Sequence, residues 1–337
     1  MITKRILIKK LYWEGLTKMK KVLIITIVNY GFIPFNKKNN VYVEYLYKRN
    51  KFNLLKRMSH KLLFSESNLF LSFPIFLQKI MFRIVFSNWF KLLKKVDTVI
   101  IFDGEKDPLI LKMIHNLYPT KRLLVWYWNS IGGDIVSPDN FNRKYTELWS
   151  FDPQNCKDYN LKYNVQFYPL ENVINNANIS SDIDLLYVGA DKTQERINIL
   201  EKIKKVCLKE KINFLFYLVK QSKENIKTSI AYYPLLKYPQ VLQLINRSSA
   251  ILDITKNNQS GLTLRPLEAL FFNKKLVTNN EDIIYHKIYK LNSANIYILG
   301  KEKKSLKEFI ELPLNKSNTA QLKKYYSFDT WLSNFFK

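Results

Sequence analysis

The sequence predicts an α/β protein with two doubly wound parallel-sheet domains that face a ligand cleft. Short apolar segments typical of buried strands alternate with helical patterns along most of the chain. A polar segment at 171–181 interrupts this alternation, which then restarts. A chain of 337 residues, 47% of them hydrophobic, can build two cores. We therefore assign 19–170 to a first domain, 171–181 to a linker, 182–324 to a second domain and 325–337 to a final helix.

The first domain is expected to contain one sheet, because apolar strand-like segments recur along it. These are Lys21–Val28, Asp97–Phe102, Arg122–Trp128 and the shorter Leu148–Phe151. Residues 40–64 instead show a helical pattern with basic residues between the apolar positions. Gly31, Asp103 and Asn129 follow the first three strands. Because the carboxyl ends of parallel strands line the ligand crevice, these three residues are candidates for the site.

A basic amphipathic helix is expected at 75–95. Cationic and small polar residues recur about every four positions there, among large apolar residues: Lys79, Arg83, Ser87, Lys91, Lys94 and Lys95. Two interpretations remain open. The helix either packs on the core with a solvated lysine face, or lies on a membrane surface, which Trp89 and the surplus of large apolar residues favour.

The second domain repeats the alternation of strands and helices, which indicates a second parallel sheet. The expected strands are Asp184–Val188, Phe214–Val219, Ala250–Ile254 and Leu276–Thr278, and the expected helices are Glu195–Leu208, Pro239–Asn246 and Pro266–Phe272. A closing helix is expected at Ser327–Phe336, with Trp331 and Phe335 as its packing residues.

The segment 259–280, QSGLTLRPLEALFFNKKLVTNN, is the most informative part of the second domain. It joins a buried strand to a helix through a loop with Gly261. Pro266 suits the first helical position, and Glu268 would then lie in the first turn, where free N–H groups attract anions. Strand, glycine loop and helix start together form an anion-receiving corner of a parallel sheet.

This segment resembles the donor-site corner of GT-B glycosyltransferases, whose pattern is Glu-Gly-Phe-Gly-Leu-Pro-Leu-Leu-Glu-Ala. The matching residues here run from Ser260 to Ala269, with Glu268 in place of the second glutamate and Ser260 in place of the first. The form Gln-Ser-Gly-Leu-Thr-x-Arg-x-Leu-Glu-Ala is similar to bacterial capsular polysaccharide and lipopolysaccharide glycosyltransferases. The resemblance implies two Rossmann-like domains and a nucleotide-sugar donor, which is a substrate, with no separate cofactor.

The resemblance also implies residue roles. Glu268 would accept hydrogen bonds from the donor ribose, and Arg265 would stabilise the leaving diphosphate as charge develops. The other implied donor-binding residues are Gly189, Lys192, Arg196, Gln259, Ser260, Gly261, Leu262 and Thr263. Ser260 and Gln259 can hydrogen-bond sugar hydroxyls but supply no negative charge.

The first domain would then bind the acceptor, with Gly31 and Asn129 on the acceptor side. An inverting displacement needs a base, for which Asp103 is the first candidate and Asp134 the next. A retaining mechanism needs no such base, and the stereochemistry stays open. No bound metal is expected, because Asp182-Ile183-Asp184, the one match to a metal-binding Asp-x-Asp motif, precedes its strand.

The formal charge of +26 is concentrated near the start of the chain. Residues 1–95 hold 20 Lys and Arg against three acids, whereas the remainder holds 34 basic and 25 acidic residues. Such a surface attracts anionic lipid, a phosphorylated acceptor or nucleic acid. Nucleic acid is not the expected partner, because no DNA- or RNA-binding motif is present. The expected partners are a nucleotide-sugar, a lipid-linked or glycan acceptor and an anionic membrane surface.

Cellular location is predicted as cytoplasmic, peripheral on the inner face of the cell membrane. No segment resembles a transmembrane helix or a signal peptide, and Cys156 and Cys207 fit a reducing compartment. Met19 resembles a natural start, so 1–18 is interpreted as an extension. Two alternative functions remain: an inactive GT-B scaffold or carbohydrate-binding partner, suggested by Ser260, and a basic nucleic-acid-binding protein.

Overall fold

The computed structural model describes residues 21–26, 40–46, 58–60, 72–102, 108–133, 135–169, 181–222, 225–255 and 259–337. These residues form two compact units. Among the described residues, one unit ends at Ser150 and the other begins at Phe151. In keeping with this division, Asp152 and Tyr168 bond to other residues of the second unit. The predicted domain ranges remain a prediction, and the two units are described separately.

The strands of the first unit form a sheet in the order β2-β1-β3-β4-β5. They are β1 (Val22–Thr26), β2 (Val41–Tyr45), β3 (Thr98–Phe102), β4 (Arg122–Tyr127) and β5 (Thr146–Ser150). All four neighbouring pairs in this order are parallel. β1 and β3 are buried along their whole length, as expected for central strands of a doubly wound sheet. The three main strands predicted for this unit are therefore confirmed.

The helical interpretation of 40–64 is wrong where the structure describes it as a strand. β2 pairs in parallel with β1, in the register Val22 to Val41. Its sequence, VYVEY, is rich in β-branched and aromatic residues, which favour a pleated, half-buried strand. Of the remaining described residues in this range, Met58–His60 are helical.

The expected helix 75–95 is divided into α4 (Ile75–Val85) and a 3-10 helix, η1 (Phe90–Lys94). Side chains between them bond to the backbone at the end of β2, which explains the break. Asn88 Nδ2 donates to Tyr45 O at 2.6 Å, and Trp89 Nε1 donates to Leu46 O at 3.2 Å. Trp89 is fully buried, so it belongs to the core and does not anchor a membrane helix. The other elements of this unit are α5 (Pro108–Leu117) and η2 (Pro138–Asn140).

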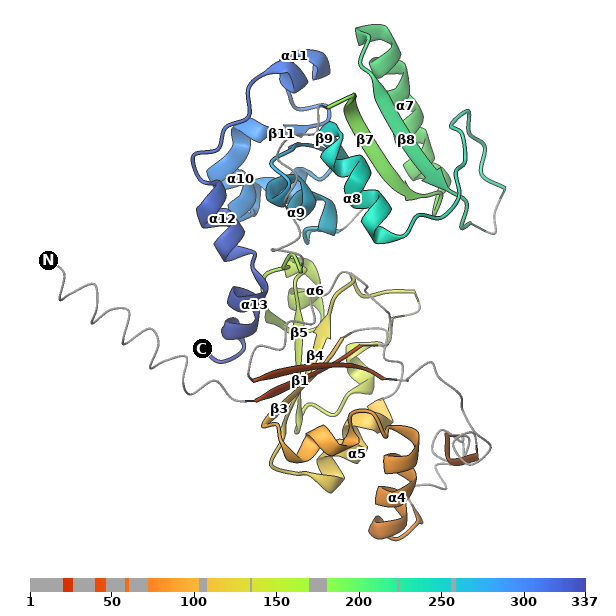
Figure 1. Ribbon diagram of the computed structural model, residues 1–337, viewed down its shortest axis with the longest axis vertical. Coiled ribbons are helices and arrows are strands. Elements are labelled where there is room, and N and C mark those ends of the chain that lie inside the picture. The colour runs from red at the N-terminus through yellow and green to blue at the C-terminus, as the bar shows by residue number, and fades with distance from the viewer. Residues whose placement is uncertain are drawn as a thin grey trace, which may run out of the picture. The chain divides into compact units, whose positions relative to one another are not determined.

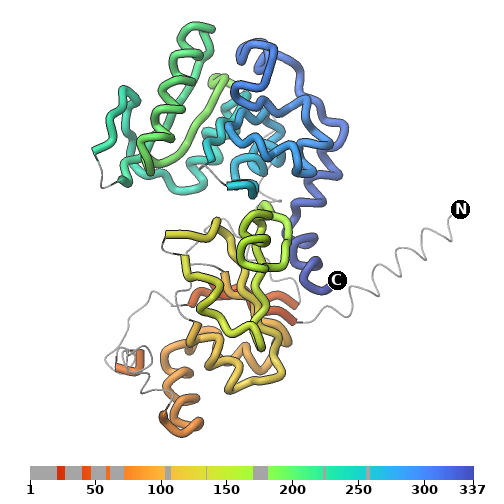
Figure 2. The backbone as a smooth tube through the Cα atoms, turned by 180° about the vertical axis from the view of Figure 1, so that it is seen from behind, coloured from red at the N-terminus to blue at the C-terminus, as the bar shows by residue number. Residues whose placement is uncertain are grey.

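The second sheet is entirely parallel, in the order β11-β10-β9-β7-β8 (Figure 1). Figure 2 shows the backbone of the same unit from behind. Its strands are β7 (Ile183–Ala190), β8 (Phe214–Val219), β9 (Ser248–Asp253), β10 (Lys275–Thr278) and β11 (Ile296–Ile298). The sequence predicted all of them except β11. Its longer helices are α7 (Gln194–Glu210), α8 (Tyr238–Asn246) and α9 (Leu264–Phe271).

Two hydrophobic cores lie on opposite faces of this sheet. Leu185 and Leu200 of α7 belong to one core, whereas Leu186 and Leu267 of α9 belong to the other. Successive strand residues thus point to opposite faces, and helices cover both. The order of strands places β9 and β7, the two strands that lead into the candidate site, side by side at the centre.

Shorter elements complete the second unit. These are α6 (Pro153–Asp158), β6 (Lys162–Tyr163), η3 (Glu281–Tyr285), α10 (Lys287–Asn292), η4 (Ser293–Asn295), α11 (Leu306–Glu311), α12 (Thr319–Tyr325) and α13 (Phe328–Asn334). The closing helix α13 buries Trp331 and Phe335, as expected. Asn164 Nδ2 donates to Trp331 O at 2.9 Å, and the Phe167 and Trp331 rings lie 4.4 Å apart.

Candidate functional site

Helix α9 begins at Leu264, two positions before the predicted start at Pro266. Thr263 is its N-cap, and Thr263 Oγ1 accepts a hydrogen bond from Arg265 N at 3.3 Å. Pro266 is tolerated within the first turn because the N–H groups there have no intrahelical partner. Glu268 therefore lies beyond the first turn, and the expectation that it complements the helix start is wrong.

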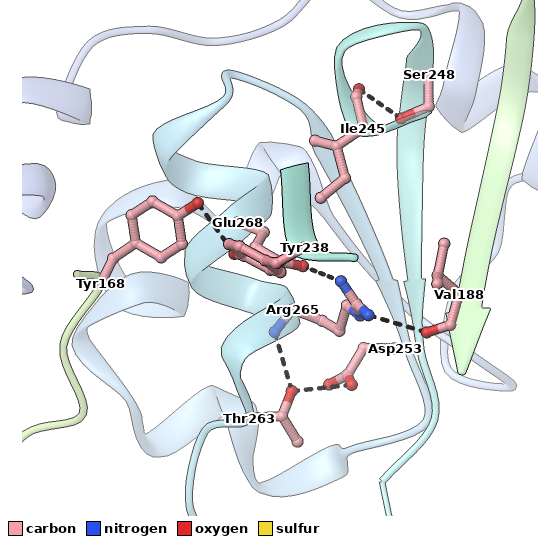
Figure 3. A network of polar contacts seen from close by, with 9 residues as sticks. All are labelled: Tyr168, Val188, Tyr238, Ile245, Ser248, Asp253, Thr263, Arg265 and Glu268. Atoms are coloured by element: carbon pink, nitrogen blue, oxygen red, sulfur yellow. Dashed lines mark hydrogen bonds and ion pairs between the residues drawn. The ribbon is translucent and has the colours of Figure 1, made fainter. Parts of the chain in front are cut away.

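Glu268 is held by Arg265 from the same helix and by Tyr238 from α8 (Figure 3). Its side chain has no solvent exposure. Arg265 Nη1 forms an ion pair with Oε2, and Tyr238 Oη donates to Oε1 at 2.8 Å. The Tyr168 hydroxyl lies 3.2 Å from that of Tyr238. Because the Tyr238 proton is used by Glu268, Tyr168 is the donor in this second bond.

The charge of Glu268 is reflected in the pKa values of its neighbours. Burial raises the pKa of Tyr238 well above its ordinary value, and the Glu268 carboxylate raises it further. Burial disfavours the charged form of Arg265, yet Glu268, Tyr238 and Asp253 together outweigh this effect and raise the pKa of the guanidinium. The result is a buried ion pair with a tyrosine donor on the opposite carboxylate oxygen.

Arg265 also connects α9 to the end of β7. Its Nη2 donates to Val188 O at 2.9 Å, and Gly189 follows directly (Figure 3). About a quarter of the Arg265 side chain remains exposed, at 23%. Arg265 is thus fixed at both ends of its guanidinium while part of it faces solvent. Arg265 thereby links the start of α9 to the carboxyl-terminal part of β7.

Asp253, the last residue of β9, is a site residue that the sequence did not reveal. It is 3% exposed, and its Oδ1 accepts a hydrogen bond from Thr263 Oγ1 at 2.9 Å. Its Oδ2 has no hydrogen-bond partner among the described residues. Burial raises the pKa of Asp253 to about 6, although Thr263, Arg265 and Arg196 each act to lower it. The strand expected at Ala250–Ile254 placed Asp253 inside the strand, whereas β9 ends at this residue.

A second carboxylate, Asp152, lies beside Ser260. The Ser260 hydroxyl donates to Asp152 Oδ1 at 2.7 Å, and Gly261 N donates to Oδ2 at 3.1 Å. Asp152 also accepts from Gln154 N and Asn155 N, which makes it the N-cap of α6. Negative charge is therefore present next to Ser260 although the family's first glutamate is missing. More than a hundred residues separate the pair, so no local pattern could have predicted it.

Gly261 is required by close packing within the unit. A Cβ at this position would lie 2.6 Å from a Phe151 ring carbon and 2.9 Å from Asp152 Cα. The loop is also held from its other side, because His286 Nε2 lies 2.7 Å from Ser260 O. A carbonyl oxygen only accepts, so Nε2 carries the proton. Burial lowers the pKa of His286, which favours the neutral ring.

The other predicted donor-binding residues differ in their surroundings. Arg196, on α7, lies near enough to Asp253 for its charge to lower the pKa of that carboxyl. Lys192 is exposed, Gln259 is half-buried, and Leu262 is buried in the hydrophobic core. In the first unit, Asn129 is exposed. The predicted residues Gly31, Asp103 and Asp134 lie outside the described residues.

Asp182 precedes β7 and Asp184 lies at its start, and both side chains accept hydrogen bonds from other residues. Asp182 Oδ1 accepts from Arg247 Nε at 2.9 Å, and Asp184 Oδ2 accepts from Asn213 N at 2.8 Å. Within the described ranges, no three His, Cys, Asp or Glu side chains cluster as metal ligands would. Each of the two aspartates is thus hydrogen-bonded to another residue of the second unit.

Known structures resemble this chain along nearly its whole length, although no protein-family model and no curated protein matches its sequence. An alpha-glucosyltransferase solved with UDP-glucose and DNA containing an abasic site has a TM-score of 0.53 and 12% identity, over 93% of this chain and 94% of that chain. A second alpha-glucosyltransferase structure, with UDP and a 13-mer DNA containing an HMU base, has a TM-score of 0.51 and 13% identity, over 94% and 99%. This chain has the GT-B glycosyltransferase fold.

The GT-B fold accounts for the two parallel sheets and confirms the predicted fold class. Both of these solved structures contain UDP or UDP-glucose, so nucleotide-sugar use is established for those neighbours. At 12% and 13% identity the similarity concerns the fold. The donor, the acceptor and the site residues of this chain are inferred below from its own side chains.

Proposed function

We propose that this protein transfers a sugar from a nucleotide-sugar donor to a lipid-linked or polysaccharide acceptor in bacterial surface-glycan synthesis, such as capsule, exopolysaccharide or lipopolysaccharide. One observation carries the proposal. In a GT-B fold, Arg265 and Glu268 form a buried ion pair on α9, next to the carboxyl ends of β7 and β9. Parallel α/β sheets bind ligands at such strand ends.

Arg265 is the residue best suited to the leaving nucleoside diphosphate. Glu268 and Val188 fix its guanidinium, and part of the side chain faces solvent. A positioned cation stabilises charge that develops in the transition state without reorganising at that moment. Arginine also presents several N–H groups in a fixed geometry that suits phosphate oxygens.

Glu268 has a more demanding role in the proposal. Both of its carboxylate oxygens already accept bonds, from Tyr238 and Arg265, and the side chain is fully buried. It reaches donor ribose hydroxyls only if Tyr238 or Arg265 moves aside. Its second contribution needs no movement, because it holds Arg265 in place. Lys192 and Arg196 add positive charge near the donor diphosphate, and Gln259 and Ser260 contact the donor sugar.

The catalytic base is proposed to be Asp103, with Asp134 next, if transfer inverts the configuration. Gly31 and Asn129 complete the acceptor side. The proposal for these residues comes from their places after strands of the first sheet. The reaction is proposed to need no metal, since Arg265 supplies positive charge at the leaving group.

Nucleotide binding by the full-length protein tests the donor site directly. Thermal unfolding is measured with UDP, GDP, dTDP and CMP and with their sugars. A donor that binds only the native state stabilises it by mass action, by about 2.7 kcal/mol at a hundredfold excess over Kd. We expect one nucleotide class to stabilise the wild type, and Arg265→Ala and Glu268→Ala to lose most of this stabilisation.

Arg247→Ala is the matched control for these variants. It removes an arginine that also pairs with a carboxylate of the second unit, Asp182, but at an exposed position. This variant should retain the full nucleotide effect. Failure of every nucleotide to stabilise the wild type would contradict the proposed function. Equal effects in all four proteins would contradict the site assignment alone.

The proposed location is the inner face of the cell membrane. In the first unit, α4 exposes Ile75, Phe76 and Ile80, with 52–60% of each residue accessible. Beside them a groove of about 440 Å³ is lined by Lys79, Ile80, Arg83, Phe90, Lys91 and Lys94. Exposed apolar residues next to four cations suit an anionic lipid surface. Within the described ranges, no helix has the length and apolar character needed to cross a bilayer.

A nucleic-acid acceptor is the second candidate. Both solved structures described above contain DNA, and this chain carries a formal charge of +26. A basic surface attracts duplex DNA through counterion release, whatever the sequence. One experiment separates sugar transfer to a DNA base from sugar transfer to a glycan. The protein is incubated with each acceptor and a donor whose sugar is labelled, and the label incorporated into each acceptor is measured.

A further inference from the structure

A cavity of about 720 Å³ lies within the second unit, outside the Arg265 corner. Its volume is within the range of small-molecule sites, roughly 300–1,000 Å³. We call it the tyrosine pocket. Its lining residues come from α6, β6, the end of η3, α10 and the end of α12: Pro153, Cys156, Tyr163, Tyr285, His286, Lys287, Lys290, Leu291, Tyr325 and Tyr326.

Aromatic rings make up much of this lining. Tyr163 and Tyr285 are exposed, at 46% and 71%, and Tyr325 is half-buried. Tyr326 and His286 are buried and held in place: Tyr326 Oη accepts from Ile288 N at 3.2 Å, and His286 Nε2 donates to Ser260 O at 2.7 Å. The pocket thus has fixed buried residues and accessible rings, and tyrosines offer both an apolar face and a hydroxyl.

The formal charge in the pocket is positive. Lys287 Nζ lies 4.3 Å from the centroid of the Tyr325 ring, and Lys290 is exposed one turn later on the same helix. No carboxylate lies among the ten lining residues, and within the described chain neither lysine forms an ion pair. His286 adds no charge, because burial lowers its pKa. The two ammonium groups are therefore available to an anion.

From this combination of accessible tyrosine rings and two lysines that form no ion pair in one cavity, we propose that the tyrosine pocket binds an anionic sugar, either a phosphosugar or a uronic acid residue. The rings pack against the C–H groups of the pyranose, and Lys287 and Lys290 pair with the phosphate or carboxylate. The site is distinct from the Arg265 corner. Its ligand binding does not depend on sugar transfer, so it can be tested whether or not the proposed function holds.

A ligand bound in the pocket should also affect the position of Ser260. His286 belongs to the pocket lining, and its other contact is the carbonyl of Ser260, whose hydroxyl bonds to Asp152. An anionic sugar against the ring of His286 would therefore act on the loop before α9 through one hydrogen bond. A sugar bound in the pocket could thus influence the loop that contains Ser260 through His286, without touching the loop itself.

Cys156 allows the pocket to be probed with a chemical reporter. The chain has two cysteines, and Cys156 lines the pocket whereas Cys207 is fully buried. Burial raises the pKa of the Cys207 thiol to about 12, so it does not react as a thiolate in the native protein. The reaction of the native full-length chain with a thiol reagent therefore reports on Cys156.

The experiment follows the rate of this reaction as glucuronate, glucose 6-phosphate, neutral glucose or inorganic phosphate is added. We expect both anionic sugars to slow the reaction in a saturable way, and glucose and inorganic phosphate to leave it unchanged at equal concentrations. Protection by only one anionic sugar would identify which anion the pocket accepts. Protection by inorganic phosphate equal to that by glucose 6-phosphate, or no protection by either anionic sugar, would overturn the proposal.

Charge reversal separates pocket binding from general attraction to a basic protein. The double variant Lys287→Glu/Lys290→Glu should lose protection, with Kd raised on the order of tenfold or more, which corresponds to 1.4 kcal/mol per factor of ten. The matched control, Lys202→Glu/Lys209→Glu, makes the same charge change at exposed positions of α7 and should keep it. Tyr285→Ala removes an exposed ring without opening the core and should weaken protection. Protection that persists in the Lys287/Lys290 variant would overturn the proposal.

Discussion

Asp253 combines near-complete burial with an ionisable group, and this combination has a thermodynamic consequence. Its carboxyl pKa is about 6 in the folded protein against an ordinary value of 3.8. Since the folded state holds the proton more tightly, this group stabilises the fold most at low pH. The contribution begins to fall near pH 4 and is lost as pH rises through about 6. At neutral pH the ionised side chain costs about 3 kcal/mol of unfolding free energy.

Asp253→Asn tests this cost. An asparagine amide oxygen can still accept the Thr263 hydrogen bond, and it carries no charge to desolvate. We expect the variant to be more stable than the wild type at pH 7.5, by up to about 3 kcal/mol, and to approach it near pH 4. Urea unfolding at several pH values measures the difference. Parallel stability–pH curves for the two proteins would show that Asp253 does not titrate as described.

A residue that costs stability in the resting protein is a candidate for function, because sites often retain such strain. Asp253 shares Thr263 with the cap of α9 and lies close enough to Arg265 and Arg196 to feel their charges. Loss of donor binding in Asp253→Asn, together with its higher stability, would place Asp253 among the donor-binding residues. Sequence reasoning missed it, because one aspartate at a strand end carries no motif.

Arg265 and Glu268 could be identified from the sequence because they belong to one short local pattern, three positions apart. Tyr168, Tyr238 and Asp152 could not. They reach Glu268 and Ser260 from separate elements, and only the tertiary fold decides which distant side chains meet. Ser260 departs from the glutamate of the resembled pattern, and no local pattern predicts the carboxylate beside it, because Asp152 lies 108 residues earlier in the chain.

Helices and strands were likewise predicted correctly where local sequence determines them, and wrongly where contacts with distant residues do. Central strands such as β3 and β9 were predicted because each is a short, buried apolar run. The single helix expected at 75–95 was wrong because its break depends on hydrogen bonds from Asn88 and Trp89 to residues more than forty positions away. The start of α9 was misplaced because Thr263 competes with Pro266 as a start signal, and the cap at Thr263 determines it.

The loop before α9 gives a stability prediction at this scale. Gly261→Ala places a Cβ within 2.9 Å of Asp152 Cα, so backbone must move, and within 2.6 Å of the buried Phe151 ring. Overpacking of this kind costs typically about 1–3 kcal/mol. We expect a loss of that size in urea unfolding of the full-length protein. An unfolding free energy equal to that of the wild type would mean that the loop and α6 are not packed this closely.

For the molecule as a whole, the formal charge of +26 and its concentration in residues 1–95 decide which partners are plausible. The two leading partners, anionic lipid and DNA, are both polyanions, so attraction alone does not separate them. They differ in the kinds of exposed side chain that strengthen their binding. Exposed apolar side chains next to the cations, which α4 provides, also strengthen binding to a membrane. Binding to duplex DNA is strengthened by the cations alone.

Removing the four positive charges of the groove beside α4, which we call the α4 groove, separates membrane binding from DNA binding. The variant replaces Lys79, Arg83, Lys91 and Lys94 by glutamine. Each cation near an anionic bilayer contributes about 1 kcal/mol, so four should matter by up to roughly a thousandfold in affinity. The matched control replaces Lys202, Lys205, Lys209 and Lys303, which are exposed in the second unit, and makes the same change in net charge. Flotation with anionic and zwitterionic vesicles, and binding to duplex DNA over a salt series, are measured for both proteins.

We expect the wild type and the control to float with anionic vesicles and the α4 variant to stay behind, because only this groove pairs cations with exposed Ile75, Phe76 and Ile80. DNA binding that depends only on net charge should weaken equally in the two variants, with similar salt dependence. If the wild type stays with the soluble fraction on both vesicle types yet binds duplex DNA tightly, the membrane proposal fails and the nucleic-acid acceptor becomes the better account. Equal loss of flotation in both variants would instead mean that lipid senses the charge of the whole molecule, and α4 would lose its assigned role.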